Sequence, residues 1–415
     1  MSQSDAGERP RIAFYLPTLA GGGAEAVVLR LAAAFVDLGF EVDLVVNRAE
    51  GAYTNRIPEQ VNCVVLKRGF RWRGQWAALR AEPADIDVLL RPVLLTRKPI
   101  QTLRYLPGLI RYLRQRRPAV LIAAMFQANL LALWARRRAV PSMSVVVCEH
   151  NTLTRRVALG AGQRREAVRW QMLPEVVGRV YAQADAVVAV SNGVADDLAE
   201  ATGLPRAAIT TLYNPATGPD IDQRAAEDPE HPWLSANAET PVILAIGRLV
   251  AQKGFLNLIE AFTRLREERQ ARLIILGEGE LRTRILDRAH ELGIAADIDL
   301  PGWVDNPCAY LARARLYVLS SDFEGLPLVL IEALACGCPV VATDCPHGPR
   351  EILDSGGYGR LVPVGDAAAL AQGLQEALDA PVVPAELKQR AADFSIASSV
   401  AGYHRLIRGL IDRAC

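Results

Sequence analysis

The sequence predicts an α/β protein built from two doubly wound parallel sheets. Short apolar, β-branched runs alternate with longer amphipathic stretches along the whole chain, which is the pattern of strand–helix units in a parallel sheet. The chain has 415 residues. A single hydrophobic core rarely supports that length, so two domains of about 200 residues each are expected.

The expected strands form two sets, one in each half of the chain. The first set covers residues 12–16, 42–46, 61–66, 120–124, 144–148 and 186–190. The second set covers residues 242–246, 273–276, 298–300, 316–319, 339–343 and 360–362. Between the sets, residues 214–241 are rich in proline and acidic side chains, which indicates a linker. We therefore expect an N-terminal domain over residues 1–213, a second domain over 214–395, and a C-terminal helix within 396–415 that packs back on the first domain.

The charge of the chain is unevenly distributed. The formal net charge is only +1, but residues 1–195 hold 27 Lys and Arg against 15 Asp and Glu, whereas residues 196–415 hold 20 against 31. Within the basic half, residues 67–117 carry thirteen basic and three acidic residues, interleaved with Phe70, Trp72, Trp76, Tyr105 and Tyr112. Such a segment either forms ordinary solvated helix faces or docks on an anionic membrane surface. It resembles no nucleic-acid reading module, so nucleic acid is not an expected partner.

The sequence predicts a cytoplasmic location. It contains no apolar run of the about 18 residues that a membrane-spanning helix needs. Residues 1–10 also lack the apolar stretch of a signal peptide. If the basic segment docks on lipid, the protein would be peripheral on the inner face of the cytoplasmic membrane. Seven scattered cysteines fit reduced thiols better than a disulfide framework.

No metal site is expected from the cysteines or from the acidic pairs. Structural zinc sites usually pair ligands as Cys-x-x-Cys, and Cys338 instead opens an apolar strand, which argues against a zinc quartet of Cys336, Cys338, Cys345 and His347. Three Asp-x-Asp triplets could hold a divalent cation, but none follows a convincing strand beside a ligand site. We interpret them as loop or helix-end residues, and they are Asp85/Asp87, Asp220/Asp222 and Asp297/Asp299.

The most informative stretch contains two glutamates, Glu324 and Glu332. An apolar strand runs into a Gly–Pro turn and then into a buried helix over residues 328–335. The first N–H groups of that helix, near Leu328 and Val329, have no partners within it and can bind phosphate. Carboxylates on both sides of such a site suggest a polyhydroxy ligand. For Glu324 the alternative is a simple capping role at the helix start.

A second group of candidates follows the strand at 242–246. Gly247, Arg248 and Lys253 lie on the loop between this strand and the next helix. A planar guanidinium and a compact ammonium both suit a diphosphate, whereas ordinary surface ion pairing is the alternative for each.

The first domain offers a glycine turn and a histidine at the carboxyl ends of its strands. Gly22 and Gly23 expose backbone N–H groups where parallel sheets bind ligands. The turn is not Gly-x-Gly-x-x-Gly, and the second strand is followed by Arg48 instead of an acidic residue, which disfavours a dinucleotide-dependent dehydrogenase. His150 follows the fifth strand and could hydrogen-bond a sugar hydroxyl or shuttle a proton, unless it is simply a core histidine.

Taken together, the motifs resemble the retaining glycosyltransferases of family 4. The Glu-x7-Glu pair Glu324/Glu332 and the Gly-Arg-x4-Lys run from Gly247 to Lys253 are the specific part of this resemblance, and weaker motifs extend it over most of the chain. The family has the GT-B architecture, in which two Rossmann-like domains face each other across a cleft. The match is closest to members that act on lipopolysaccharide cores, capsules and lipid-linked oligosaccharides.

The resemblance also implies a role for each candidate residue. Arg248 and Lys253 would neutralise the departing nucleoside diphosphate, so neither a metal nor a cofactor is expected. Glu332 would accept hydrogen bonds from the ribose, and Glu324 would contact the donor sugar and phosphate. His150 would touch the sugar at its reactive side. Gly22 and Gly23 would let the backbone approach the sugar-phosphate of the donor or the acceptor. The remaining contacts to the donor would come from Gly247, Gly277, Leu328 and Val329.

The expected activity is transfer of a hexose or N-acetylhexosamine with retention of configuration. The donor would be a nucleoside-diphosphate sugar, a UDP-sugar first and GDP-mannose next, and the acceptor a glycolipid or polysaccharide precursor. Front-face attack, with the leaving phosphate taking the acceptor's proton, is the implied mechanism. Two alternatives are a GT-B sugar-nucleotide epimerase and a non-catalytic subunit that binds nucleotide sugars.

Overall fold

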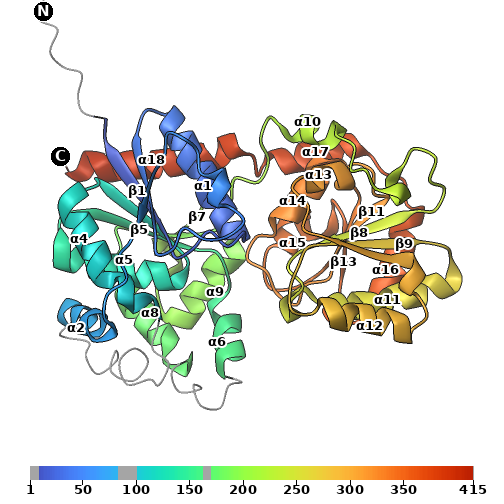
Figure 1. Ribbon diagram of the computed structural model, residues 1–415, viewed down its shortest axis with the longest axis horizontal. Coiled ribbons are helices and arrows are strands. Elements are labelled where there is room, and N and C mark those ends of the chain that lie inside the picture. The colour runs from blue at the N-terminus through green and yellow to red at the C-terminus, as the bar shows by residue number, and fades with distance from the viewer. Residues whose placement is uncertain (1–8, 83–100, 162–169, 415) are drawn as a thin grey trace, which may run out of the picture. The chain divides into compact units, whose positions relative to one another are not determined.

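The computed structural model describes residues 9–82, 101–161 and 170–414. The chain divides into two compact units (Figure 1). The first consists of Met1–Pro215 together with Ser399–Cys415, and the second consists of Ala216–Ser398. Each unit contains one parallel sheet with helices on both faces, as the alternation of apolar runs and amphipathic stretches predicts.

The first unit is built on a seven-stranded sheet with the order β3-β2-β1-β4-β5-β6-β7. All neighbouring strands pair in parallel. The strands are β1 (Arg11–Leu16), β2 (Glu41–Val46), β3 (Asn62–Val65), β4 (Val120–Ala124), β5 (Ser144–Glu149), β6 (Ala186–Ala189) and β7 (Ile209–Thr211). Six of them lie where the sequence predicts strands, and β7 adds an edge strand of three residues that was not predicted.

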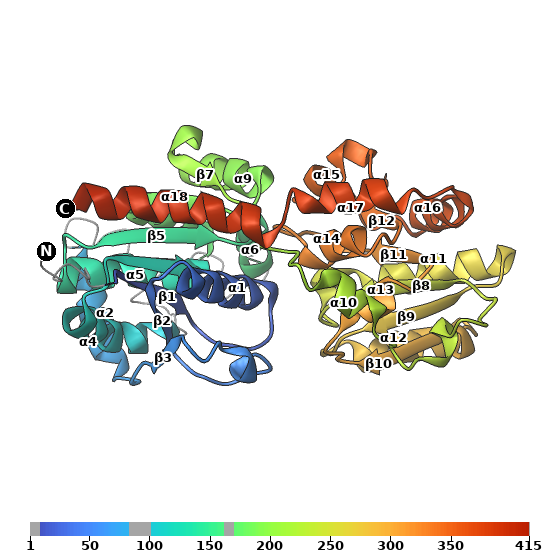
Figure 2. The same ribbon diagram turned by 90° about the horizontal axis from the view of Figure 1, so that it is seen from above.

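Helices cover both faces of this sheet. They are α1 (Gly23–Asp37), α2 (Arg71–Ala81), α4 (Leu106–Arg116), α5 (Phe126–Ala139), α6 (Leu153–Ala161), α8 (Leu173–Tyr181) and α9 (Asn192–Thr202), joined by the end of α18 (Ile396–Ala414). In α18, His404 packs against Phe35 of α1, and the Tyr403 hydroxyl donates a hydrogen bond to Cys148 Sγ in β5 at 3.9 Å. Helix α18 therefore lies along one face of the sheet (Figure 2).

The second unit is built on a six-stranded sheet with the order β10-β9-β8-β11-β12-β13, again parallel throughout. Its strands are β8 (Val242–Ile246), β9 (Arg272–Leu276), β10 (Ile298–Gly302), β11 (Leu316–Leu319), β12 (Val340–Thr343) and β13 (Arg360–Val362). Its helices are α10 (Ile221–Ala226), α11 (Phe255–Glu268), α12 (Arg282–Glu291), α13 (Pro307–Leu311), α14 (Leu328–Ala335), α15 (Pro349–Ile352), α16 (Ala367–Asp379) and α17 (Pro384–Ala392). All six strands lie where the sequence predicts them. Among the described residues, no helix is long and apolar enough to cross a membrane.

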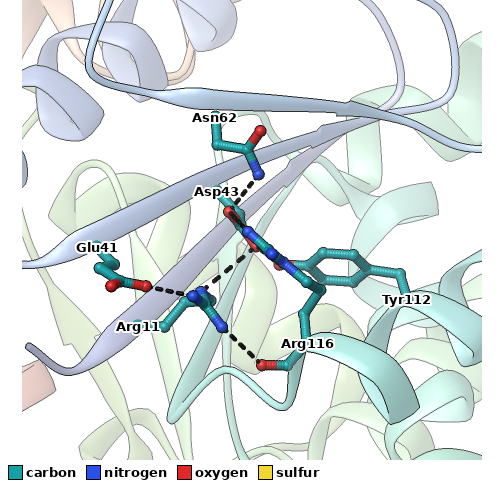
Figure 3. Close-up of polar contacts among 6 residues, drawn as sticks. All are labelled: Arg11, Glu41, Asp43, Asn62, Tyr112 and Arg116. Atoms are coloured by element: carbon teal, nitrogen blue, oxygen red, sulfur yellow. Dashed lines mark hydrogen bonds and ion pairs between the residues drawn. The ribbon is translucent and has the colours of Figure 1, made fainter. Parts of the chain in front are cut away.

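A buried carboxylate joins two strands of the first unit to the helix α4 (Figure 3). Asp43 in β2 is only 2% exposed. It accepts hydrogen bonds from Asn62 Nδ2 and from the Tyr112 hydroxyl, each at 2.7 Å, and from the Arg116 guanidinium at 3.2 and 3.3 Å. Burial alone would raise the pKa of Asp43, but these hydrogen bonds outweigh burial and hold the pKa below its usual value.

Replacing Asp43 should destabilise the first unit. In Asp43→Ala the Tyr112 hydroxyl loses its acceptor in the interior, and we expect a loss of about 2–3 kcal/mol in the free energy of unfolding, measured by urea denaturation at pH 7. Because folding lowers the pKa of Asp43, its stabilising effect is complete above the pKa of the unfolded chain and is lost as the pH falls through the lower folded pKa. The difference between variant and wild type should therefore shrink in acid.

Asp37→Ala is the matched control, because Asp37 is an exposed residue at the end of α1. It should change the free energy of unfolding by less than about 0.5 kcal/mol. An Asp43→Ala variant as stable as this control would contradict the structural role assigned to Asp43.

Candidate functional site

The candidate site in the second unit lies where the strand order of its sheet reverses. Strands β8 and β11 are neighbours in the centre of the sheet, and the chain runs outward from them in opposite directions. The loops that follow two such strands diverge, which leaves room for a ligand at their carboxyl ends. The loop after β8 contains Gly247, Arg248 and Lys253, and the loop after β11 contains Glu324.

An ion pair connects these two loops. Lys253 Nζ lies 2.6 Å from Glu324 Oε1, and the two side chains are 18% and 8% exposed. The Ser321 hydroxyl donates to the same oxygen at 2.7 Å. Gln252 Nε2 strengthens the connection by donating to the Phe323 carbonyl at 2.9 Å. The second carboxylate oxygen, Oε2, accepts no hydrogen bond from the part of the chain that the structure describes, so it remains available to a ligand.

Arg248 lies on the loop after β8 as an exposed side chain. Its guanidinium forms no hydrogen bond or ion pair with any of residues 9–82, 101–161 and 170–414. Surface ion pairing, the alternative for this residue, is therefore not seen within those ranges. A cation that no carboxylate neutralises can interact fully with an anionic ligand.

Two glycines allow the loops at this edge to approach one another. Gly254 has a φ of +62°, and a Cβ atom there would lie 2.0 Å from the Ser320 carbonyl oxygen. Gly277, after β9, has a φ of +131°, and a Cβ atom there would lie 2.1 Å from the Gly247 carbonyl oxygen. Both the left-handed conformation and the close contact therefore require glycine. A larger residue at either position would push apart the loops that hold Lys253 and Arg248.

Helix α14 begins and ends at the residues that the sequence predicts, Leu328 and Ala335. Its N-cap is Pro327, and no side chain caps it, so Glu324 is not a capping residue for this helix. The first N–H groups, near Leu328 and Val329, have no partners within the helix. Glu332 lies in its second turn and is 6% exposed. Of the predicted site residues, Gly247, Arg248, Lys253, Gly277, Glu324 and the start of α14 thus share the carboxyl edge of one sheet.

In the first unit, the glycine turn caps helix α1. Gly22 is the N-cap of α1 and no side chain caps this helix, while Gly23 is its first residue and is exposed. Glu25, in the first turn, is buried, and its Oε2 would lie 2.6 Å from a Cβ atom at Gly22. A carboxylate therefore occupies the space beside this helix start, which makes it less suited to a phosphate than the start of α14 is.

His150 follows β5 and is 8% exposed. Burial lowers its pKa to about 4, so the imidazole is neutral at pH 7. The ring forms no hydrogen bond with any residue in the described part of the chain. Just before it, Glu149 accepts hydrogen bonds from Asn129 Nδ2 at 3.0 Å and from the Tyr181 hydroxyl, which fixes the end of the strand.

The structure also adds residues that the sequence did not single out. Met125 directly follows β4, one of the two strands between which the order of the first sheet reverses, and it has a φ of +77°, a strained conformation for a residue other than glycine. Ser321 and Gln252 support the loop that carries Glu324. The only signal for these two in the sequence is their polarity, which most loop residues share.

The remaining predictions concern acidic pairs and thiols. Three of the aspartates pair with a basic residue: Asp222 with Lys388, Asp297 with Arg266, and Asp299 with His231. Asp220 lies 3.8 Å from Arg224, and Asp85 and Asp87 lie outside the described residues. The Cys336 and Cys338 thiols donate to different carbonyls, those of Cys308 and Ala314.

Two family models match consecutive parts of this chain. The one described as a glycosyl transferase 4-like domain matches residues 22–215, and the one described as glycosyl transferases group 1 matches residues 227–394. The first match covers most of the described first unit, and the second lies within the second unit.

Curated relatives match over part of their length. The N-acetylgalactosamine-N,N'-diacetylbacillosaminyl-diphospho-undecaprenol 4-alpha-N-acetylgalactosaminyltransferase of Campylobacter jejuni is 34% identical over 204 residues, which is 49% of this chain and 53% of that protein. The lipopolysaccharide core biosynthesis glycosyltransferase LpsE of Rhizobium meliloti is 36% identical over 143 residues, 34% of this chain and 41% of that protein. The chain thus spans about half or less of the length of these relatives.

The fold is also found in a solved structure. The crystal structure of Anabaena HepE in complex with UDP and glucose has a TM-score of 0.72 and 18% sequence identity, covering 97% of this chain and 100% of that one. At this identity the likeness shows the fold alone. The fold is therefore GT-B-like. The two family models, which together match residues 22–215 and 227–394, and the partial matches to the two curated relatives show that the chain belongs to the group 1 glycosyltransferases of family 4 and is related to glycosyltransferases of lipopolysaccharide core and lipid-linked oligosaccharide synthesis.

Proposed function

We propose that this protein transfers a sugar from a nucleoside-diphosphate sugar to a glycolipid or polysaccharide precursor, with retention of configuration. The observation that carries this proposal is the ion pair between Lys253 and Glu324 at the switch point of the second sheet, with Arg248, which pairs with no described residue, on the same loop as Lys253. This arrangement is suited to a ligand that has both phosphates and hydroxyl groups.

The charges at the switch point favour a diphosphate. Glu324 neutralises about one of the two cations, Arg248 and Lys253, and the start of α14 adds a partial positive charge. The remaining positive charge would stabilise a departing nucleoside diphosphate as its negative charge develops. Glu324 Oε2 is available to accept a hydrogen bond from the donor sugar. In our proposal Glu332 accepts hydrogen bonds from the ribose, and Gly247 and Gly277 contact the donor through their backbones.

His150 would act as a neutral hydrogen-bonding group. With its pKa lowered to about 4, the ring is a neutral imidazole and not an imidazolium at neutral pH, so it suits hydrogen bonding to a sugar hydroxyl better than general acid catalysis. The helix start at Gly22 and Gly23 has the carboxylate of Glu25 beside it, which favours acceptor hydroxyls over a phosphate there. The acceptor's proton would then go to the leaving phosphate in a front-face reaction.

The relatives guide the choice of substrates. The name of the Campylobacter jejuni relative describes transfer to a sugar on diphospho-undecaprenol, and the Anabaena structure contains UDP and glucose. We therefore propose a UDP-sugar as the donor, with GDP-mannose as the next choice, and a lipid-linked acceptor. An epimerase with the same donor would instead turn over the nucleotide sugar without an acceptor.

Lys253→Ala should lower kcat by about 10²–10³-fold in a donor-turnover assay, because it removes a cation from the departing diphosphate. Lys388→Ala is the matched control, since Lys388 forms an exposed ion pair with Asp222 in the same unit. The control should keep near-normal turnover. Near-normal turnover by Lys253→Ala would contradict the proposed role of this site, provided that its circular dichroism spectrum matches that of the control and so shows a folded protein.

The burial of His150 predicts that its imidazole titrates at a lower pH than an ordinary histidine. Because folding lowers its pKa from about 6.5 to about 4, its stabilising effect is complete above pH 6.5 and is lost as the pH falls toward 4. Turnover should therefore show no inflection from His150 between about pH 5.5 and 8. NMR titration of the histidine C–H signals, assigned with His150→Asn, measures this directly. A His150 pKa near 6.5 would contradict the neutral role.

A further inference from the structure

Helices α2 and α4 form an open hollow in the outer helix layer of the first unit. It has a volume of about 570 Å³ and is lined by Trp72, Arg73, Trp76 and Arg80 of α2, by Arg111 and Arg114 of α4, and by Arg138 at the end of α5. We call these seven residues the α2–α4 surface. The two helices lie side by side in Figure 2. None of the residues that line the hollow is acidic.

The arginines of the α2–α4 surface are exposed and pair with no carboxylate of the described residues. Within the described ranges, none of the five forms an ion pair, and Arg114 donates only to the Arg138 carbonyl, at 2.6 Å. Other arginines of the same unit do pair, as Arg136 does with Asp185 and Arg137 with Glu82. The positive charge of the surface is therefore concentrated and not neutralised locally, which favours an anionic partner.

Large aromatic side chains lie beside these charges. Trp72 and Trp76 are 57% and 56% exposed, and Phe70, just before α2, is 66% exposed. The two tryptophans are four residues apart, so they share one face of α2. The Arg73 guanidinium lies 5.2 Å from the Trp72 ring centroid, and that of Arg80 lies 5.7 Å from the Trp76 ring centroid. Each cation thus stacks on a ring that is itself open to solvent.

We propose that the α2–α4 surface docks the protein on a bilayer that contains anionic phospholipids. Indole rings favour the headgroup level of a membrane, and guanidinium groups bind phosphate through paired hydrogen bonds. Basic side chains near an anionic leaflet each strengthen binding, and the effect falls off within a Debye length. A nucleic acid duplex or an acidic protein would match the charge of this surface but would not by itself require solvent-exposed rings around it. None of the residues of this surface belongs to the candidate site in the second unit, so docking does not depend on donor binding.

Co-sedimentation of the full chain with vesicles tests this proposal. Vesicles of phosphatidylcholine with about 30% phosphatidylglycerol should bind the protein, and vesicles of phosphatidylcholine alone should bind it at least about tenfold less. Raising NaCl to about 0.5 M should weaken binding to the anionic vesicles. Arg73→Gln/Arg111→Gln removes two unpaired charges and should lower the affinity about tenfold or more. Trp72→Ser/Trp76→Ser should also lower it, including at high salt.

The matched control is Arg264→Gln/Arg284→Gln, which removes two exposed arginines from α11 and α12. It should bind vesicles like the wild type. The proposal is wrong if both kinds of vesicle bind the protein equally, if the arginine variant binds like this control, or if a DNA duplex is bound while anionic vesicles are not. The thermal shift caused by UDP is measured in the same samples. A protein that binds UDP but not anionic vesicles would contradict the docking proposal alone and leave the proposed transferase function intact. Both double variants of the α2–α4 surface should show the same UDP-induced thermal shift as the wild type.

Discussion

The ion pair between Lys253 and Glu324 is the interaction on which the candidate site depends. Moving two charged side chains out of water costs free energy. A short ion pair offsets that cost only when further hydrogen bonds are made to the two charged groups. Here the 2.6 Å contact and the hydrogen bond from Ser321 meet that requirement. The pair joins the loops after β8 and β11, on either side of the point where the strand order reverses. The position of Glu324 is thus fixed by a cation and not by the helix that follows it.

The two units have similar sheet topologies but different groups at the carboxyl edges of their sheets. In the second unit, the edge of the sheet presents cations, an uncapped helix start and glycines that let the loops approach one another. In the first unit, the corresponding edge presents the neutral imidazole of His150 and a helix start with a carboxylate beside it. The edge of the second sheet is thus better suited to a phosphate than the edge of the first.

Much of the fold could be predicted from the sequence, because hydrophobic periodicity is a local signal. The bounds of α14 followed from a buried apolar run between Pro327 and Gly337. Strand β7 was missed because three residues, Ile209 to Thr211, are too few to show a periodic pattern. The placement of Arg248 and Glu324 on loops at the ends of strands could likewise be predicted from the apolar runs that precede them.

What could not be predicted are the contacts that depend on topology. Lys253 and Glu324 are 71 residues apart, and Asp43 and Arg116 are 73 residues apart. Only the order of the strands decides that these side chains meet, so the alternative of a capping role for Glu324 stayed open. Composition similarly indicated a basic, aromatic segment, but which arginines lack a carboxylate partner depends on how α2, α4 and α5 pack.

The central claim is that the switch point of the second sheet binds a nucleoside diphosphate through its own cations. Isothermal titration of UDP into the full chain, in buffer with EDTA, tests it most directly. The account predicts saturable binding of one UDP per chain, weakened about tenfold or more in Arg248→Gln/Lys253→Gln. Binding that is absent, or that is unchanged in this double variant, would contradict the account.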